Sequence, residues 1–167
     1  MLLYLQEPWN KDLKIILIGA TTLDGKISKA KNEYVDWSLD LPLFKKQTLN
    51  NTIIIGSKTL ATLRKPLLDR QIIVLSRNMN LEHVLLEIST PKCFIVGGTK
   101  TYSLFLKYIT HLYITPHPLF FGSKSKPFFE NVEFNRKIRF SKKILVHKQK
   151  KIYQLQYKIY DWIKNKW

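Results

Sequence analysis

Short apolar runs alternate with amphipathic stretches along the first two-thirds of the chain. Five of these runs predict strands that are buried on both faces of a sheet, namely 14–19, 52–56, 71–76, 92–98 and 111–115. Helices are expected after the first four, at 40–51, 57–65, 81–88 and 99–108. This alternation of strands and helices is typical of a largely parallel sheet in an α/β protein.

The C-terminal third has a different pattern. Residues 116–127 predict a loop rich in Pro, Gly, Ser and Lys, and 138–148 and 151–160 then predict an antiparallel pair of strands. In the second strand one face would carry Tyr153, Leu155, Tyr157 and Ile159, and the other Gln154, Gln156 and Lys158. The predicted fold is a mixed α/β sheet of about eight strands, mostly parallel with an antiparallel C-terminal edge and helices on both faces.

Length and composition narrow the class of protein. The chain of 167 residues, 45% hydrophobic and 13% aromatic, is too apolar for a disordered basic tail. We expect a single domain over 1–167, with an N-terminal extension at 1–13 and a tail at 161–167. No apolar run approaches the roughly 18 residues of a membrane span, and the N-terminus lacks the basic lead of a signal peptide.

The single cysteine, Cys93, lies within an apolar run and predicts a buried, inert thiol. One cysteine excludes an internal disulfide and a cysteine-cluster metal site, and it fits a cytoplasmic protein. The four histidines (83, 111, 117 and 147) have neither metal-ligand spacing nor a nucleophile motif beside them, so we expect surface or core positions and no metal.

The net charge is 28 − 12 = +16, and it is uneven. From residue 134 onward eleven basic residues face one acid, which gives +10. The charge predicts an anionic partner, and a nucleic-acid-binding protein is therefore a competing class. Only five of the 28 basic residues are arginine, the side chain best suited to guanine and phosphate recognition, so no specific nucleic-acid partner is expected. The C-terminal lysines are interpreted as the solvated face of a strand.

Glycine, hydroxyl and lysine side chains follow two of the predicted strands. The turns at 55–59 (IGSKT) and 96–101 (VGGTKT) each lead into a predicted helix, whose free N–H groups favour phosphate. Ser76 and Arg77 follow a third strand. Because the carboxyl ends of parallel strands form one edge, these groups predict a site for a phosphate-bearing ligand there. Neither GxxxxGK[ST] nor GxGxxG is present.

Asp40 is the acid with the clearest candidate role. It precedes a helix whose apolar face is expected to contain Leu41, Phe44 and Leu49. One interpretation is a simple helix N-cap. The other is a partly buried carboxylate, favoured by the helix dipole, that binds the amidine-like edge of a heterocycle through two hydrogen bonds.

Residues 15–129 resemble the dihydrofolate reductase superfamily. The motifs that carry the resemblance occur in family order at 20–28 (ATTLDGKIS), 40–49 (DLPLFKKQTL), 54–59 (IIGSKT), 66–77 (PLLDRQIIVLSR), 94–106 (FIVGGTKTYSLFL) and 111–115 (HLYIT). The resemblance implies a dihydrofolate-reductase-like fold with a mobile loop at 20–28. It also implies that NADPH is the cofactor and that hydride is transferred to the C=N bond of 7,8-dihydrofolate, giving tetrahydrofolate.

The resemblance also implies residue roles. Asp40 would bind the pterin edge and raise the proton affinity of the imine nitrogen, Phe44 would pack on the ring, and Thr115 would bridge Asp40 and the ligand. Arg70 would hold the glutamate carboxylate. The catalytic set is thus Asp40, Thr115 and the nearby Trp37. Ala20 would touch both substrate and cofactor. The implied cofactor residues are Ala20, Ile27, Gly56, Ser57, Lys58, Thr59, Ser76, Arg77, Gly97, Gly98, Thr99, Lys100, Thr101 and Tyr102.

Two segments favour a different substrate. Residues 22–28 (TLDGKIS) and 115–129 (TPHPLFFGSKSKPFF) look more like the pyrimidine reductase of riboflavin synthesis, which reduces a diaminopyrimidinone ribosyl phosphate with NADPH. The short 66–77 segment, Asp40 and Arg70 favour a folate instead. Another small-molecule substrate remains a third alternative. The partners expected are small molecules, with no membrane partner, and both a monomer and a homodimer stay open.

Overall fold

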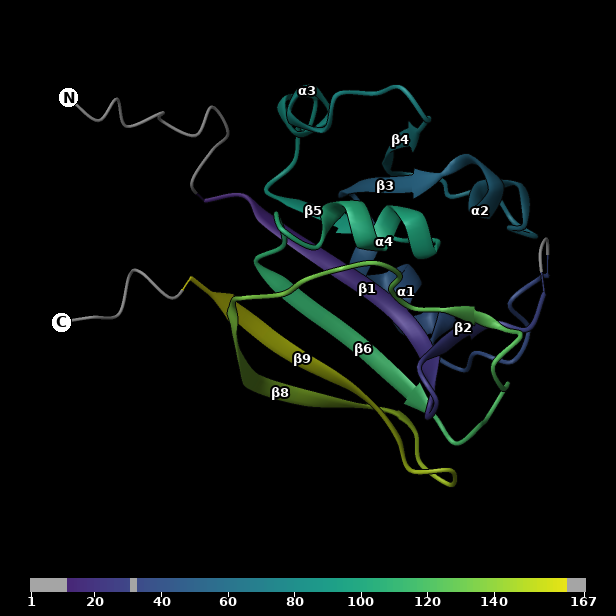
Figure 1. The fold of residues 1–167 in the computed structure, drawn as a ribbon. Coiled ribbons are helices and arrows are strands. Elements are labelled where there is room, and N and C mark those ends of the chain that lie inside the picture. Colours follow the sequence, from purple (N-terminus) through teal and green to yellow (C-terminus); the bar gives the residue numbers. More distant parts are fainter. Residues whose placement is uncertain (1–11, 31–32, 162–167) are drawn as a thin grey trace, which may run out of the picture.

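The computed structural model describes residues 12–30 and 33–161, and its centre is a seven-stranded sheet (Figure 1). The strand order is β4-β3-β5-β1-β6-β9-β8. The strands are β1 (Lys14–Thr22), β3 (Thr52–Gly56), β4 (Gln71–Leu75), β5 (Lys92–Ile95), β6 (His111–His117), β8 (Lys137–His147) and β9 (Ile152–Tyr160). The first five are parallel, whereas β9 is antiparallel to both β6 and β8. The predicted mixed sheet with an antiparallel C-terminal edge is confirmed.

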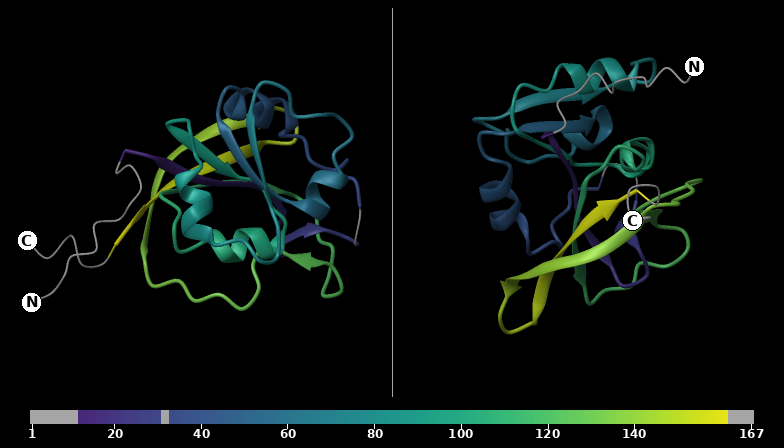
Figure 2. Two further views of the ribbon diagram at one scale, coloured as in Figure 1. Left: turned by 90° about the horizontal axis from the view of Figure 1, so that it is seen from above. Right: turned by 90° about the vertical axis from the view of Figure 1, so that its left-hand side faces the viewer.

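Helices cover both faces of this sheet, as predicted, although each is shorter than its expected range. They are α1 (Leu41–Thr48), α2 (Ser57–Ala61), α3 (Leu81–Leu86) and α4 (Thr99–Phe105). Val84 of α3 and Phe105 of α4 are buried in one core layer. Phe44 of α1 and Leu60 of α2 pack against the other layer. Figure 2 shows the sheet between these helices, with the β8–β9 pair at a steep angle to the opposite edge.

Two predicted loops are partly strands. β1 continues to Thr22, which pairs with His117 at the end of β6. Beyond these residues β2 (Lys26–Ser28) pairs antiparallel with β7 (Lys126–Pro127) in a separate ribbon. Neither 20–28 nor 116–127 is therefore a loop throughout. The β2–β7 pairing joins segments about one hundred residues apart, which a local pattern does not reveal.

The expected apolar face of α1 is wrong. Leu41 is 51% exposed and Leu49 is 40% exposed, whereas Thr48 is fully buried. At 100° per residue Leu49 lies about 140° around the helix from Phe44, so the two cannot share a face. The stripe that faces the sheet instead contains Phe44 and Thr48, one turn apart.

The polar face of β9 is also not uniformly solvated. Gln154 and Gln156 are buried, because α1 lies over this part of the strand. The side chains of Gln47 and Gln154 exchange two hydrogen bonds of 2.7 and 3.0 Å, and Gln156 donates to Gln154 at 2.8 Å. These bonds satisfy amides that burial would otherwise destabilise. The lysines of β8, in contrast, are exposed as expected.

Several further features bear on the sequence predictions. Cys93 is buried, and burial raises the pKa of its thiol, which makes it a poor nucleophile. Among residues 12–30 and 33–161, no helix is long and apolar enough to cross a membrane. The same ranges contain no cluster of three or more metal-ligating side chains. Most of the predicted extension and tail, 1–11 and 162–167, lies outside the described residues, although Leu13 is part of the core.

Candidate functional site

The carboxyl ends of the parallel strands bring together predicted site residues that are far apart in the sequence. Ala20 of β1 and Thr115 of β6 are register partners. At the end of β3, the Gly56 amide donates a 2.8 Å hydrogen bond to the carbonyl of Gly97, which follows β5. This hydrogen bond joins the turns that begin α2 and α4 at the carboxyl ends of β3 and β5.

The Gly97–Gly98 turn forms a cradle at this edge. Its peptide bond is cis, and Gly97 has a φ of 111°, a backbone conformation that favours glycine. A Cβ at Gly98 would lie 3.2 Å from the Thr59 hydroxyl and 3.9 Å from the Ile27 side chain. Residues from β2, α2 and this turn thus surround a space that glycine leaves open. A backbone that a ligand can approach closely, at a helix start, fits a pyrophosphate-bearing cofactor.

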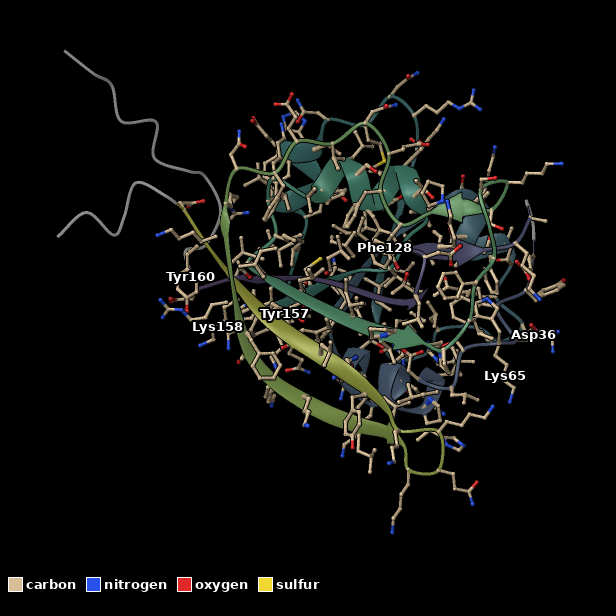
Figure 3. All side chains as sticks on the ribbon, turned by 60° about the horizontal axis from the view of Figure 1, so that its bottom comes forward. Asp36, Lys65, Phe128, Tyr157, Lys158 and Tyr160 are labelled. Carbon is tan, nitrogen blue, oxygen red and sulfur yellow. The ribbon has the colours of Figure 1, made fainter. Side chains whose placement is uncertain are left out.

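Tyr102 supports this turn from beneath. Its hydroxyl lies 2.8 Å from the Ile18 carbonyl oxygen and 3.0 Å from that of Val96. Its ring stacks at 4.5 Å on Phe128, which is labelled in Figure 3. Burial, and to a lesser extent the Asp40 carboxylate, raises the pKa of Tyr102. The contribution of Asp40 to this shift is consistent with the Asp40 carboxylate lying on the same side of the sheet edge as Tyr102.

The remaining predicted cofactor residues differ in exposure. Thr101 is buried, and the Thr99 hydroxyl donates a 2.6 Å hydrogen bond to the Pro127 carbonyl. The exposed members, at the starts of α2 and α4 and after β4, are Ser57, Lys58, Ser76, Arg77 and Lys100. Their hydroxyl and cationic groups face solvent, where they can meet phosphates.

Asp40 is buried, with 5% exposure, and does not cap α1. Its backbone carbonyl accepts the first helical hydrogen bond, from Phe44 at 2.8 Å, but its carboxylate makes no bond to the helix. Instead the Ser38 hydroxyl donates to Oδ1. The simple N-cap interpretation is therefore wrong, because the Asp40 carboxylate makes no hydrogen bond to the helix amides.

His117 holds the segment that carries Asp40. Its Nε2 accepts a 3.0 Å hydrogen bond from the Leu39 amide, so its Nδ1–H donates to the Thr115 carbonyl at 2.9 Å. The ring is 1% exposed and meets Trp37 edge to face at 5.2 Å. The sequence indicated only a surface or core histidine. Its connecting role depends on a contact across 78 residues, for which the chain carries no local signal.

Two buried polar atoms lack a hydrogen-bond partner among the described residues, and both belong to predicted catalytic residues. They are Thr115 Oγ1 and Trp37 Nε1. Unpaired buried polar atoms are rare and unfavourable in folded proteins. A ligand that supplies the missing partners would explain both, which fits the bridging role expected for Thr115.

Arg70 lies at the opposite end of α1 from Asp40. Its Nε donates to Thr48 Oγ1 at 2.9 Å, Nη2 to the Lys45 carbonyl at 3.0 Å, and Nη1 to the Leu68 carbonyl at 2.5 Å. Each Nη retains a second hydrogen for a carboxylate. Because eight helical residues span about 12 Å, a ligand that contacts both Asp40 and Arg70 must be elongated.

Asp24 is a residue near the site to which the sequence analysis gave no role. Its carboxylate accepts hydrogen bonds from the amides of Phe121, at 3.2 Å, and Gly122, at 2.8 Å, and from the Thr22 hydroxyl. The Thr22 bond contributes most, and the two amides less, to lowering the pKa of Asp24. The turn between β1 and β2 is thereby fastened to the loop after β6.

Comparison with known proteins agrees with this arrangement. The family model for dihydrofolate reductase matches residues 14–161. The dihydrofolate reductase of Staphylococcus haemolyticus is 30% identical over 167 residues, which cover 91% of this chain and 98% of the relative.

Two solved structures share the fold. Dihydrofolate reductase from Enterococcus faecalis, complexed with NADP(H), has a TM-score of 0.74 at 22% identity, covering 89% of this chain and 97% of that one. A structure assigned to riboflavin biosynthesis in Shewanella sp. PV-4 has a TM-score of 0.68 at 19% identity, covering 88% and 99%. Since the family model spans nearly all of the sheet and the site, the chain belongs to the dihydrofolate reductase family.

Proposed function

We propose that this protein reduces 7,8-dihydrofolate to tetrahydrofolate by transferring hydride from NADPH to a C=N bond. The observation that carries the proposal is the buried carboxylate of Asp40, which makes no capping hydrogen bond to α1. His117 links Leu39, the residue before Asp40, to the backbone carbonyl of Thr115. The Thr115 hydroxyl has no hydrogen-bond partner among the described residues. A carboxylate and a hydroxyl in such surroundings suit the amino and ring N–H edge of a pterin.

NADPH, when bound, supplies the hydride, and the chain supplies position and electrostatics. The Gly97–Gly98 turn would hold the pyrophosphate against backbone N–H groups. Lys58, Ser76 and Arg77 would meet the adenosine phosphates at the exposed rim. Ala20 and Ile27 would line the nicotinamide side, with Tyr102 beneath the turn. The full set proposed for the cofactor is Ala20, Ile27, Gly56, Ser57, Lys58, Thr59, Ser76, Arg77, Gly97, Gly98, Thr99, Lys100, Thr101 and Tyr102.

The substrate would lie along α1. Asp40 would accept hydrogen bonds from its pterin edge, and Phe44, one turn later, would pack on the ring. Arg70 would bind the carboxylate at the far end with its two remaining Nη hydrogens. The distance between the two ends of α1 favours a long ligand such as a folate.

Protonation of the substrate would occur from solvent. Asp40 is hydrogen-bonded by Ser38 and would stabilise the positive charge that develops at the imine nitrogen, rather than donate the proton itself. Thr115 would bridge Asp40 and the ligand, and Trp37 would shield the ring from water. Every residue in this scheme comes from one chain, so both a monomer and a homodimer are compatible with it, and the expected location is the cytoplasm.

The test is a side-by-side assay of purified protein with NADPH and either dihydrofolate or the diaminopyrimidinone ribosyl phosphate. We expect the absorbance of reduced nicotinamide to fall when dihydrofolate is added, and methotrexate to compete with dihydrofolate. If NADPH were oxidised with the ribosyl phosphate but not with dihydrofolate, the proposal would be overturned in favour of the pyrimidine reductase. That alternative is supported by the sequence of 22–28 and 115–129. Asp24 connects these two segments.

A further inference from the structure

Basic side chains gather on one face of the sheet at the amino ends of its parallel strands, opposite the proposed reductase site. Lys14 of β1 and Lys92 of β5 are register partners. Ile16, two residues after Lys14, pairs with His111 of β6, which in turn pairs with Lys158 of β9. Because residues two apart and register partners share a face, the three lysines and the histidine lie on the same side of four adjacent strands.

These side chains border one hollow of about 260 Å³. Figure 3 shows Lys158 on β9, the strand that lies between β6 and the edge strand β8. None of the lysines of the hollow forms a salt bridge with a carboxylate in residues 12–30 and 33–161. The charged and aromatic residues of the lining are Lys14, Lys92, His111, Tyr113, Lys142, Tyr157 and Lys158.

The pKa of His111 is affected by the lysines around this hollow. Burial, followed by Lys14, Lys158 and Lys92, lowers the pKa of His111. Lys142 from β8 completes the charged groups that line the hollow, and the His111 Nδ1 lies 2.8 Å from the Thr110 hydroxyl. Like charges that face one another across strands are destabilising, so this arrangement would be relieved by a bound anion.

We propose that this hollow binds a compact polyanion with several phosphate groups, such as an oligophosphate. Lysine ammonium groups are point charges that suit phosphate oxygens, and here four of them border a single space. The lining includes no arginine, and its four lysines outnumber its two tyrosines, Tyr113 and Tyr157, which favours a compact phosphate ligand over a stacked nucleic-acid strand. The site lies at the opposite end of the strands from the cofactor residues and does not depend on the reductase assignment.

The experiment is an NMR titration of the histidine ring protons with inorganic tripolyphosphate, on protein saturated with NADPH so that the phosphate positions at the other end of the sheet are filled. We expect tripolyphosphate to shift the His111 resonance and raise its pKa, since the anion offsets the lysines. The combined variant Lys14→Gln, Lys92→Gln and Lys158→Gln should lose about tenfold or more in affinity.

The matched control removes three charges from the β8–β9 turn, in the variant Lys148→Gln, Lys150→Gln and Lys151→Gln, and should bind like the unmodified protein. An unmoved His111 resonance, or an equal loss of affinity in the two triple variants, would overturn the proposal. Binding of a single-stranded oligonucleotide through the hollow without any response to tripolyphosphate would also overturn it and indicate a nucleic-acid surface. These readouts do not depend on reductase activity.

Discussion

The two ends of the parallel strands present their polar groups in different surroundings. At the carboxyl ends the buried Asp40 and Thr115 and the glycine backbone at residues 97 and 98 lie beside exposed side chains such as Lys58 and Arg77. At the amino ends the polar groups are solvent-exposed lysines, among them Lys14 and Lys92. Buried groups act in a low-dielectric surrounding, whereas exposed charges are screened by salt. A single substitution of a buried polar group at the first end should therefore have a large effect, and a single substitution of an exposed lysine at the second end a small one.

The strongest test of this difference is Asp40→Asn. We expect turnover with dihydrofolate to fall at least ~10²-fold, because the neutral amide no longer stabilises the charge that develops on the substrate. The measurement is steady-state kinetics at saturating NADPH. Asp36→Asn is the matched control, because Asp36 is an exposed acid in the segment that leads to α1 (Figure 3). Unchanged turnover in the Asp40 variant would assign Asp40 a structural role only.

The second test concerns an exposed charge at the carboxyl end. If Arg77 contacts a 2′-phosphate, Arg77→Glu should raise the KM for NADPH by about tenfold or more and leave the KM for NADH nearly unchanged. Arg64→Glu provides the control, since Arg64 is also exposed and stacks on the Tyr34 ring at 5.1 Å. Equal changes for both nucleotides would remove Arg77 from cofactor discrimination.

The parts of the fold that could be predicted from sequence are those encoded by local pattern. The strand Thr52–Gly56 has the predicted bounds, because an apolar run ends at a glycine and is followed by a helix start. The order of the strands and helices followed from the same signals. The gathering of the candidate site residues at one edge followed from the rule that the carboxyl ends of parallel strands meet.

What the sequence did not reveal depends on particular side-chain contacts, most of them between distant segments. Gln154 has the pattern of a solvated strand residue, but α1 covers it and Gln47 satisfies its amide. Asp40 has the position of an N-cap, yet its side chain turns to Ser38. His117 connects two segments through hydrogen bonds that its neighbours in sequence do not indicate. For Gln154 and His117 tertiary packing overrides a sound local preference, whereas for Asp40 a neighbouring hydroxyl takes the place of the helix amides.

His117→Phe tests whether the buried end depends on such connections. Phenylalanine keeps a ring against Trp37 but leaves the Leu39 amide without its acceptor, so the free energy of unfolding should fall by about 1–3 kcal/mol. Urea denaturation measures the loss. His83→Phe is the control, because His83 is exposed and should change stability by less than about 0.5 kcal/mol. An unaltered unfolding midpoint in the His117 variant would show that the Leu39 bond contributes nothing to the fold.

The smallest effect is expected at the amino end, in the contribution of His111 to the pH dependence of the free energy of unfolding. Burial and the neighbouring lysines lower the pKa of His111 in the folded protein, so the unfolded chain binds this proton more readily. The stabilising contribution of neutral His111 is therefore complete above the unfolded value of about 6.5 and is lost as the pH falls through the lower folded value. Urea denaturation across this range should show a shallower loss of stability in His111→Gln. Lys14→Gln should weaken the effect only in part, because burial, the larger cause, remains. If Lys14→Gln abolished the pH dependence entirely, charge rather than burial would control His111, and the amino end would be more sensitive to single substitutions than its exposure suggests.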